Sequence, residues 1–93
     1  MLTHVVSFKY KAGATEAQRS DHRAKLQGIS ALAGILDFKV GEDVVHSPRS
    51  YDTGLVVQFR DRAALDGYAT HPRHVPVAQL GRELSDAIVA VDF

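Results

Sequence analysis

The chain has 93 residues, of which 45% are hydrophobic and 24% charged, so it fits one folded domain over residues 1–93 and is not expected to be disordered. Basic and acidic residues number 11 each, and this balance provides no excess positive charge to favour nucleic acid as a partner. The sequence contains no cysteine, which excludes a disulfide framework, a thiolate metal site and a catalytic thiol.

The N-terminal residues predict a strand. Residues 4–10 alternate, and the face expected to be covered carries His4, Val6, Phe8 and Tyr10. This start lacks the basic and apolar regions of a secretory signal, and no later stretch approaches the roughly 18 apolar residues of a membrane span. We therefore expect a cytoplasmic protein without a membrane partner.

A helix is predicted to begin after Thr15, because Thr15 and Gln18 have the spacing of a capping box. Apolar and partly apolar side chains then recur every three or four residues, and this inward stripe consists of His22, Leu26, Ile29 and Ala33. Gly34 follows the stripe at the position expected of a C-cap glycine, so the predicted helix extends to residue 33. Within the stripe, His22 is the only strongly polar side chain.

Two further strands are predicted in the middle of the chain. Residues 35–44 alternate and are followed by a polar loop that contains Pro48. A third strand follows the loop, and its covered face carries Leu55, Val57 and Phe59.

The C-terminal third predicts two short helices and a last strand. Asp61 is a suitable N-cap for a helix that includes Tyr68, and Pro72 disfavours helical geometry at the residue before it. A third helix is expected over residues 76–85, and residues 88–93 are expected to form the last strand.

The predicted order is therefore β-α-β-β-α-β, which is the α+β, ferredoxin-like arrangement of a four-stranded antiparallel sheet with helices on one face. The other face of the sheet is expected to carry several apolar side chains, namely Val5, Ile35, Val56, Ile88 and Ala90. A chain this short has a small core, and burial of this face against a second copy would enlarge it. We expect a homodimer that forms through the sheet faces.

Four segments have the order and spacing of a known family. They are His4–Lys9, Tyr51–Phe59, Tyr68–His74 and Val91–Phe93. With these segments the chain resembles, from end to end, the stress-responsive A/B barrel domain family, often abbreviated Dabb. The resemblance implies a dimeric α/β barrel, in which the sheets of two identical subunits face one another.

The resemblance also implies candidate residues for chemistry. Olivetolic acid cyclases, plant polyketide cyclases among such proteins, close a ring by intramolecular aldol condensation without metal or cofactor. Their tyrosine and histidine pair falls on Tyr68 and His74, and a histidine of their first strand falls on His4. A further pocket histidine is replaced here by Thr53, so the same reaction does not follow from the resemblance.

The predicted elements direct these polar groups toward one interior space beneath the helices. A histidine there could act as a base next to a carbonyl group, and a phenol could donate a hydrogen bond to the developing enolate oxygen. We assign the role of base to His74 and the role of acid to Tyr68. The candidate substrate contacts are His4, Phe8, His22, Thr53 and Leu55.

Each candidate also has a structural interpretation. Tyr68 could be a packing residue with its hydroxyl at the rim of the core, and His74 could bond only to loop backbone. His22 could be a polar residue close to the surface, and His71 could meet the carbonyl groups at the end of a helix. His46 lies in the polar loop and has no functional assignment.

Cofactor sites are not expected. His4, His71 and His74 could supply zinc ligands, but Pro72 interrupts the helix between the last two and no carboxylate is near them in the sequence. The chain also lacks a phosphate-binding glycine loop and a serine nucleophile elbow.

Three functions remain open from the sequence. The first is a cofactor-free enzyme or binding protein for a small hydrophobic carbonyl compound. The second is a non-catalytic dimer in stress response or scaffolding, in which the same residues fill a polar core. The third is haem binding with His74 as the axial ligand, which would need a clear apolar slot.

Overall fold

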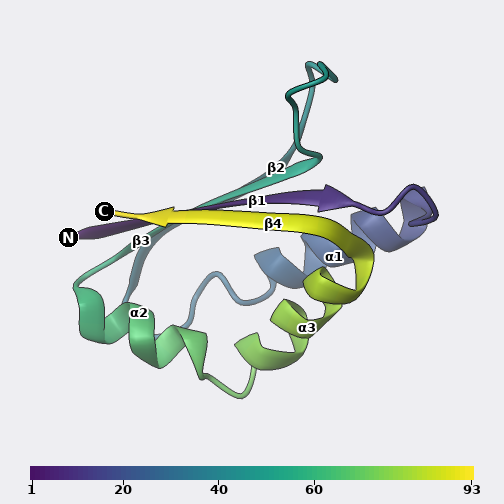
Figure 1. Cartoon of the computed structure of the whole chain (residues 1–93). Helices are drawn as coiled ribbons and strands as arrows, with labels where there is room; N and C mark the ends of the chain where they lie inside the picture. Colours follow the sequence, from purple (N-terminus) through teal and green to yellow (C-terminus); the bar gives the residue numbers. More distant parts are fainter.

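The computed structural model describes residues 1–93 and contains four strands and three helices (Figure 1). In chain order the elements are β1 (Leu2–Tyr10), α1 (Glu16–Gln27), β2 (Ile35–Glu42), β3 (Thr53–Phe59), α2 (Arg62–Ala69), α3 (His74–Leu84) and β4 (Ser85–Asp92). This order is the predicted βαββαβ pattern, with the second helical segment divided at Pro72 into α2 and α3.

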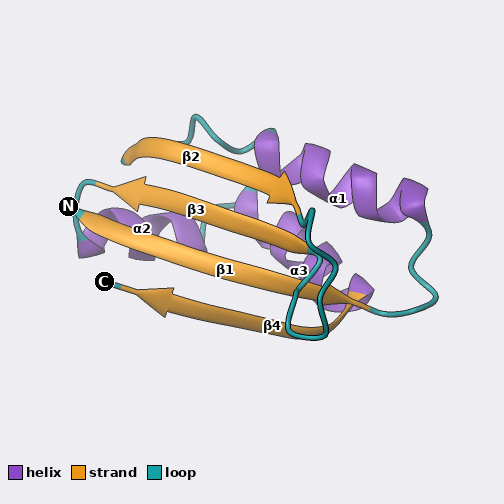
Figure 2. Ribbon diagram, turned by 90° about the horizontal axis from the view of Figure 1, so that it is seen from above, coloured by secondary structure: helices purple, strands orange, loops and turns teal.

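The strands form one antiparallel sheet in the order β2-β3-β1-β4 (Figure 2). All three helices lie on one face of this sheet, and we call the opposite, uncovered face the open face (Figure 1). The ferredoxin-like α+β prediction is therefore confirmed. The core between sheet and helices consists of Val6, Phe8, Tyr10, Leu26, Ile29, Leu32, Leu55, Val57, Phe59, Tyr68, Val77 and Leu84.

Alternation in the two central strands determines which side chains meet the helices. Val6 of β1 pairs with Leu55 of β3, and Phe8 pairs with Thr53, and all four side chains are buried. Paired residues on neighbouring strands point to the same side of a sheet. The predicted covered faces of β1 and β3 are thus confirmed.

The helix starts follow the predicted capping residues. At α1, the Gln18 backbone N–H donates to Thr15 Oγ1 at 3.1 Å, and the Thr15 backbone N–H donates to Gln18 Oε1 at 2.8 Å. At α2, the Ala64 backbone N–H donates to Asp61 Oδ1 at 2.9 Å. These bonds satisfy donors that the first turn of a helix leaves without a partner.

The predicted end of the first helix is wrong. Helix α1 ends at Gln27 with Gly28 as its cap, and Ala33 is exposed. The chain continues in turns, in which the Ile29 N–H donates to Leu26 O at 3.1 Å. Such bonds, three residues apart, prolong helix-like spacing after the helix has ended, which explains the misleading stripe.

Gly34 instead forms the turn before β2, with a φ angle of +88°. A Cβ atom at this position would lie 2.7 Å from Ala64 Cβ in α2.

We expect Gly34→Ala to lower the free energy of unfolding by about 2 kcal/mol or more, because it adds a left-handed backbone penalty to this steric clash. Urea denaturation measures the change. Gly67→Ala is the matched control: outside its own helical turn nothing lies within 4 Å of the added Cβ, and we expect it to stabilise α2 by about 0.5–1 kcal/mol. Equal stability of the two variants would contradict this account.

Three of the residues predicted for the open face lie on the helix side. A bulge between Ile35 and Asp37 turns Ile35 onto the core, where it pairs with Phe59. In β4, Ile88 pairs with Phe8 and Ala90 pairs with Val6, so both share the covered face of β1. Residues 87–91 of β4 are all apolar, so alternation could not identify the covered face of this strand.

The open face carries valines from three strands. Val5 and Val56 pair across β1 and β3, and Val5 also pairs with Val91. Val89 and Val91 are 50% and 55% exposed. The predicted apolar open face is therefore present, with a partly different set of residues.

Several element boundaries also differ from the predictions. Strand β2 ends at Glu42, so Val44 lies in the loop that rises from the open face in Figure 1. Helix α3 begins two residues earlier than predicted, and β4 follows it directly at Ser85. The Lys11 N–H donates to Leu84 O at 2.8 Å, which joins the end of α3 to the end of β1.

Candidate functional site

A partly enclosed cavity of about 130 Å³ lies between the sheet and helices α1 and α3. It is lined by His4, Val6, Phe8, His22, Leu26, Leu55, His74, Val77, Ala78, Arg82 and Ile88. The structure thus brings five predicted site residues to one space, namely His4, Phe8, His22, Leu55 and His74. The other two, Tyr68 and Thr53, do not line it.

His74 is the first residue of α3 and lines the cavity. Its Nδ1 lies 3.1 Å from Ala69 O, so Nδ1 carries the proton and donates to this carbonyl group. Burial lowers the pKa of His74, and the hydrogen bond to Ala69 opposes this shift, while the charges of His4 and Arg82 add to it. At neutral pH the ring is therefore neutral, and Nε2 keeps a free lone pair.

Tyr68 lies in the core directly against His74. Its ring centroid is 4.2 Å from that of His74 and 5.1 Å from that of Phe59. The hydroxyl is buried without a hydrogen-bond partner, so it is not at the rim that a simple packing role would suggest. Burial raises the pKa of Tyr68 to about 12, so the phenol stays protonated at neutral pH.

His22 is 0% exposed, and the interpretation of this residue as a polar group close to the surface is wrong. Helix α1 lies on the sheet so that the ring of His22 meets Phe8 edge-on, with 4.8 Å between centroids. Nδ1 lies 2.7 Å from Tyr10 Oη, whereas Nε2 has no partner. Burial, with a smaller contribution from the charge of Arg23, lowers the pKa of His22 to about 4.

Thr53 lies beside the cavity and belongs to a hydrogen-bond network. Its Oγ1 is 2.9 Å from Tyr10 Oη and accepts from Arg23 Nη1 at 3.3 Å. Tyr10 was not among the residues predicted to be functional. Strand alternation places Tyr10 on the same face as His4, and this signal could have identified it.

Two polar residues at or near the cavity, Asp92 and Arg82, were also not predicted. His4 Nδ1 contacts the carboxylate of Asp92, its partner in the β1–β4 register. Arg82 lines the cavity from α3, and its guanidinium donates to Gln79 Oε1 at 2.9 Å. Neither residue stands out in the sequence, because the β4 register and the rotation of α3 bring them to the cavity.

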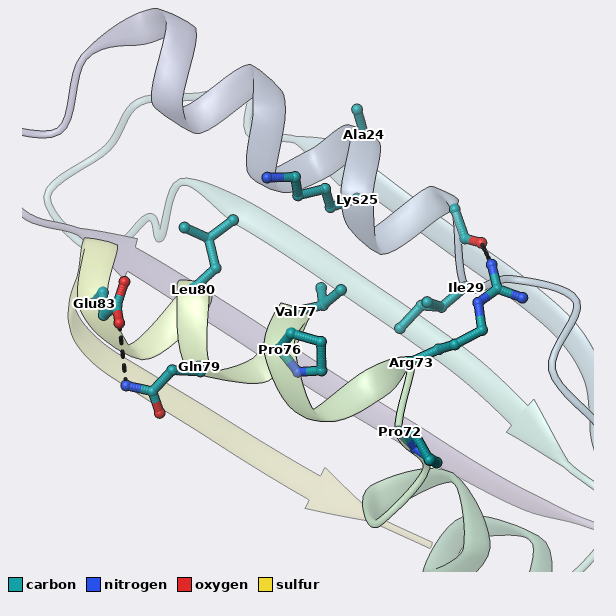
Figure 3. A pocket seen from close by; sticks show the side chains of 11 residues that line it. Ala24, Lys25, Ile29, Pro72, Arg73, Pro76, Val77, Gln79, Leu80 and Glu83 are labelled. Carbon is teal, nitrogen blue, oxygen red and sulfur yellow. Dashed lines mark hydrogen bonds between the residues drawn. The ribbon is translucent and has the colours of Figure 1, made fainter.

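The largest hollow of the surface is a different one, an open groove of about 870 Å³ between α1 and α3 (Figure 3). Arg73 spans one end and donates to Gly28 O at 3.0 Å. The groove is lined by no histidine and no buried acid or base. Val77 lines both hollows, so α3 separates the groove from the cavity.

No group of three or more His, Cys, Asp or Glu side chains is close enough together to hold a metal ion. None of the helices combines the length and apolar character needed to cross a membrane. His71 is held locally, because its Nδ1 accepts the Arg73 backbone N–H at 3.0 Å.

The buried state of His22 predicts a pH-dependent stability. Between the ordinary pKa of 6.5 and about 4, the unfolded chain binds a proton at His22 that the folded chain does not. We expect the free energy of unfolding to fall as the pH falls through this window, by up to about 3 kcal/mol. Urea denaturation at several pH values measures this slope. His22→Phe should make it shallower, whereas His46→Ala, an exposed loop variant, should leave it unchanged. A His22→Phe variant with the slope of the original chain would contradict this origin.

The βαββαβ order, with helices on one face of a four-stranded antiparallel sheet, defines a ferredoxin-like protein. Comparison with known families then gives a particular one. The chain belongs to the stress-responsive A/B barrel domain family, Dabb, whose profile matches residues 2–93. The predicted family is therefore confirmed.

Solved structures support the same fold. A dimeric ferredoxin-like protein of unknown function from Thermobifida fusca is 20% identical, with a TM-score of 0.91 over 99% of this chain and 88% of that one. A second such protein, from Jannaschia, is 28% identical, with a TM-score of 0.83 over 99% and 96%. A hydroxynitrile lyase from Passiflora edulis is 20% identical, with a TM-score of 0.81 over 99% and 90%. No curated protein matches the sequence.

Proposed function

We propose that the cavity binds a small hydrophobic carbonyl compound and that His74 removes a proton from the carbon next to the carbonyl group. The observation that carries this proposal is the hydrogen bond from His74 Nδ1 to Ala69, which leaves Nε2 as a free base on a mostly apolar cavity wall. A neutral histidine with a fixed tautomer is suited to this role. No cofactor is required for the step.

In this reaction the C–H bond next to the carbonyl breaks, and its proton moves to His74 Nε2. The electron pair of that bond forms an enolate, whose negative charge rests mainly on oxygen. Tyr68, the residue predicted as the acid, keeps its proton at neutral pH but does not line the cavity, so another group must donate the hydrogen bond to the enolate oxygen. The Tyr68 ring packs against His74 and supports the position of the base.

The size of the cavity limits the ligand. An apolar cavity of about 150 Å³ takes one benzene molecule, and pockets for larger ligands measure about 300–1,000 Å³. At about 130 Å³, the cavity suits a five- or six-membered ring or a short chain. A haem or a long polyketide does not fit into it.

The comparison with the Passiflora edulis structure is compatible with this proposal. That protein is a hydroxynitrile lyase, so the fold can carry an active site. At 20% identity the likeness shows the fold alone, and the proposed chemistry of this chain rests on its own cavity.

We also propose that the chain forms a homodimer through its open face. The support comes from the exposed Val89 and Val91 on this face and from two similar structures that are described as dimeric. Val44 and Val45 are exposed on the loop that rises beside the same face (Figure 1). A partner seated there would cover apolar surface from both the sheet and the loop.

Deuterium exchange tests the proposed chemistry without knowledge of the natural substrate. Cyclohexanone in D₂O exchanges its α-hydrogens when a base removes them, and proton NMR follows the loss of their signal. We expect the protein to accelerate this exchange above the rate in matched buffer that contains free imidazole. A rate equal to that of buffer would refute the enzymatic proposal and favour the alternative of a non-catalytic dimer.

A further inference from the structure

A buried series of hydrogen bonds runs from the surface of α1 to the cavity. Arg23 Nη1 lies 3.3 Å from Thr53 Oγ1, and this hydroxyl lies 2.9 Å from Tyr10 Oη. Tyr10 Oη in turn lies 2.7 Å from His22 Nδ1. We call these four side chains the relay, and its last member, His22, lines the cavity.

The chemistry of the donors gives the relay one direction. Arginine can only donate, so Thr53 accepts from Arg23 and has its own proton to give to Tyr10. Tyr10 then donates to His22 Nδ1. The reverse arrangement would leave the Thr53 proton without an acceptor, since this hydroxyl contacts only Arg23 and Tyr10. Only the first direction therefore satisfies every hydroxyl proton.

This direction determines the state of the His22 ring. Nδ1 accepts a hydrogen bond and carries no proton, so the proton of the neutral ring is on Nε2. Nε2 is buried without a partner, which is costly for a donor and needs an explanation. A bound ligand that accepts this hydrogen bond supplies one.

The buried Nε2 faces Gly81 of α3. A Cβ atom at Gly81 would lie 3.0 Å from Nε2, so a glycine inside α3 leaves room for this edge of the ring. Val77, Ala78 and Arg82 of the same helix line the cavity. Tyr68 and Ser85, whose hydroxyl groups are also buried without a partner, are not part of the cavity wall.

We propose that His22 donates its Nε2–H to the carbonyl oxygen of the bound ligand, and that Tyr10 and Thr53 are positioning residues which hold His22 in this tautomer. This inference rests on the proposed function and makes it more specific. The carbonyl oxygen is held from α1, while His74 acts on the neighbouring carbon from α3. The site then selects small ketones over hydrocarbons of the same shape.

Two probes of nearly equal shape test the selection. Cyclohexanone has a carbonyl oxygen where methylenecyclohexane has a CH₂ group, which accepts no comparable hydrogen bond. We expect the protein to bind the ketone about three- to tenfold more tightly, as one neutral hydrogen bond would give. Tyr10→Phe should remove most of this preference while binding the hydrocarbon as before. Tyr51→Phe, outside the relay, should keep the preference.

Nitrogen NMR tests the tautomer directly and does not depend on any ligand. In protein labelled with ¹⁵N on histidine, the chemical shifts distinguish protonated from unprotonated ring nitrogens. We expect His22 of the original chain to be protonated on Nε2, and Tyr10→Phe to weaken that state. A proton on Nδ1 would overturn the inference, whatever the exchange assay shows.

The outcomes separate this inference from the proposed function. Ketone preference that depends on Tyr10, without deuterium exchange, would support the role of His22 and refute the action of His74 as a base. Deuterium exchange by the original chain, together with a ketone preference that Tyr10→Phe leaves unchanged, would support His74 as the base and refute the role of His22. The carbonyl oxygen of the ligand would then be bound by Arg82 or His4. Absence of any ketone preference in the original chain would overturn the inference.

Discussion

Replacement of His74 by asparagine is expected to slow α-deuterium exchange of cyclohexanone about 10²- to 10⁴-fold, which is the usual contribution of a general base. Asparagine is chosen because its side-chain N–H can take over the bond that His74 Nδ1 donates to Ala69 O at 3.1 Å. The start of α3 should then keep its structure. The variant loses only the nitrogen that we assign as the base.

His71→Asn is the matched control for this variant. His71 lies in the short connection between α2 and α3 but does not line the cavity. Its Nδ1 accepts a hydrogen bond from the backbone N–H of Arg73. We expect exchange at the rate of the original chain. Thermal unfolding of both variants identifies any loss that comes from misfolding. A His74→Asn protein with an intact fold and an unchanged exchange rate would show that the base is elsewhere.

A lysine at Val89 is expected to convert the proposed dimer into a monomer. Val89 pairs with Ser7 on the open face, and a symmetric interface would contain the substitution twice. Each buried ammonium group without a partner costs several kcal/mol, and about 3 kcal/mol already weakens association more than 100-fold. Sedimentation velocity at micromolar concentration measures the change in mass.

Val75→Lys provides the comparison for that experiment. Val75 is 48% exposed and lies on α3, on the opposite side of the sheet from the open face. We expect this variant to remain a dimer. Dissociation by both lysines would point to an interface that includes the helices, and a monomeric original chain would rule out the dimer.

The parts of the fold that the sequence predicted are those with strong local signals. Thr15 and Asp61 start their helices because capping bonds depend on neighbouring residues alone. The covered faces of β1 and β3 follow from alternation. In β4 both faces are apolar, so the position of Ile88 depends on its pairing with Phe8 and could not be predicted locally.

In the candidate site, too, local sequence patterns predicted some features, whereas contacts between distant residues determine others. Alternation and helical spacing brought His4, His22 and His74 to one interior, and the structure places all three on one cavity. The network around His22 depends on contacts between residues far apart in the chain, such as the Tyr10–Thr53 bond. No sequence spacing encodes those distances, so the depth of His22 was misjudged.

The position of a bound ketone tests the central claim most directly. With the methyl groups of the protein selectively labelled, nuclear Overhauser effects from cyclohexanone identify the side chains around it. We predict effects to the methyl groups of Val6 and Leu55, which line the cavity and not the groove. Effects to Ile29 and Leu80, which line only the groove, would contradict the proposed site.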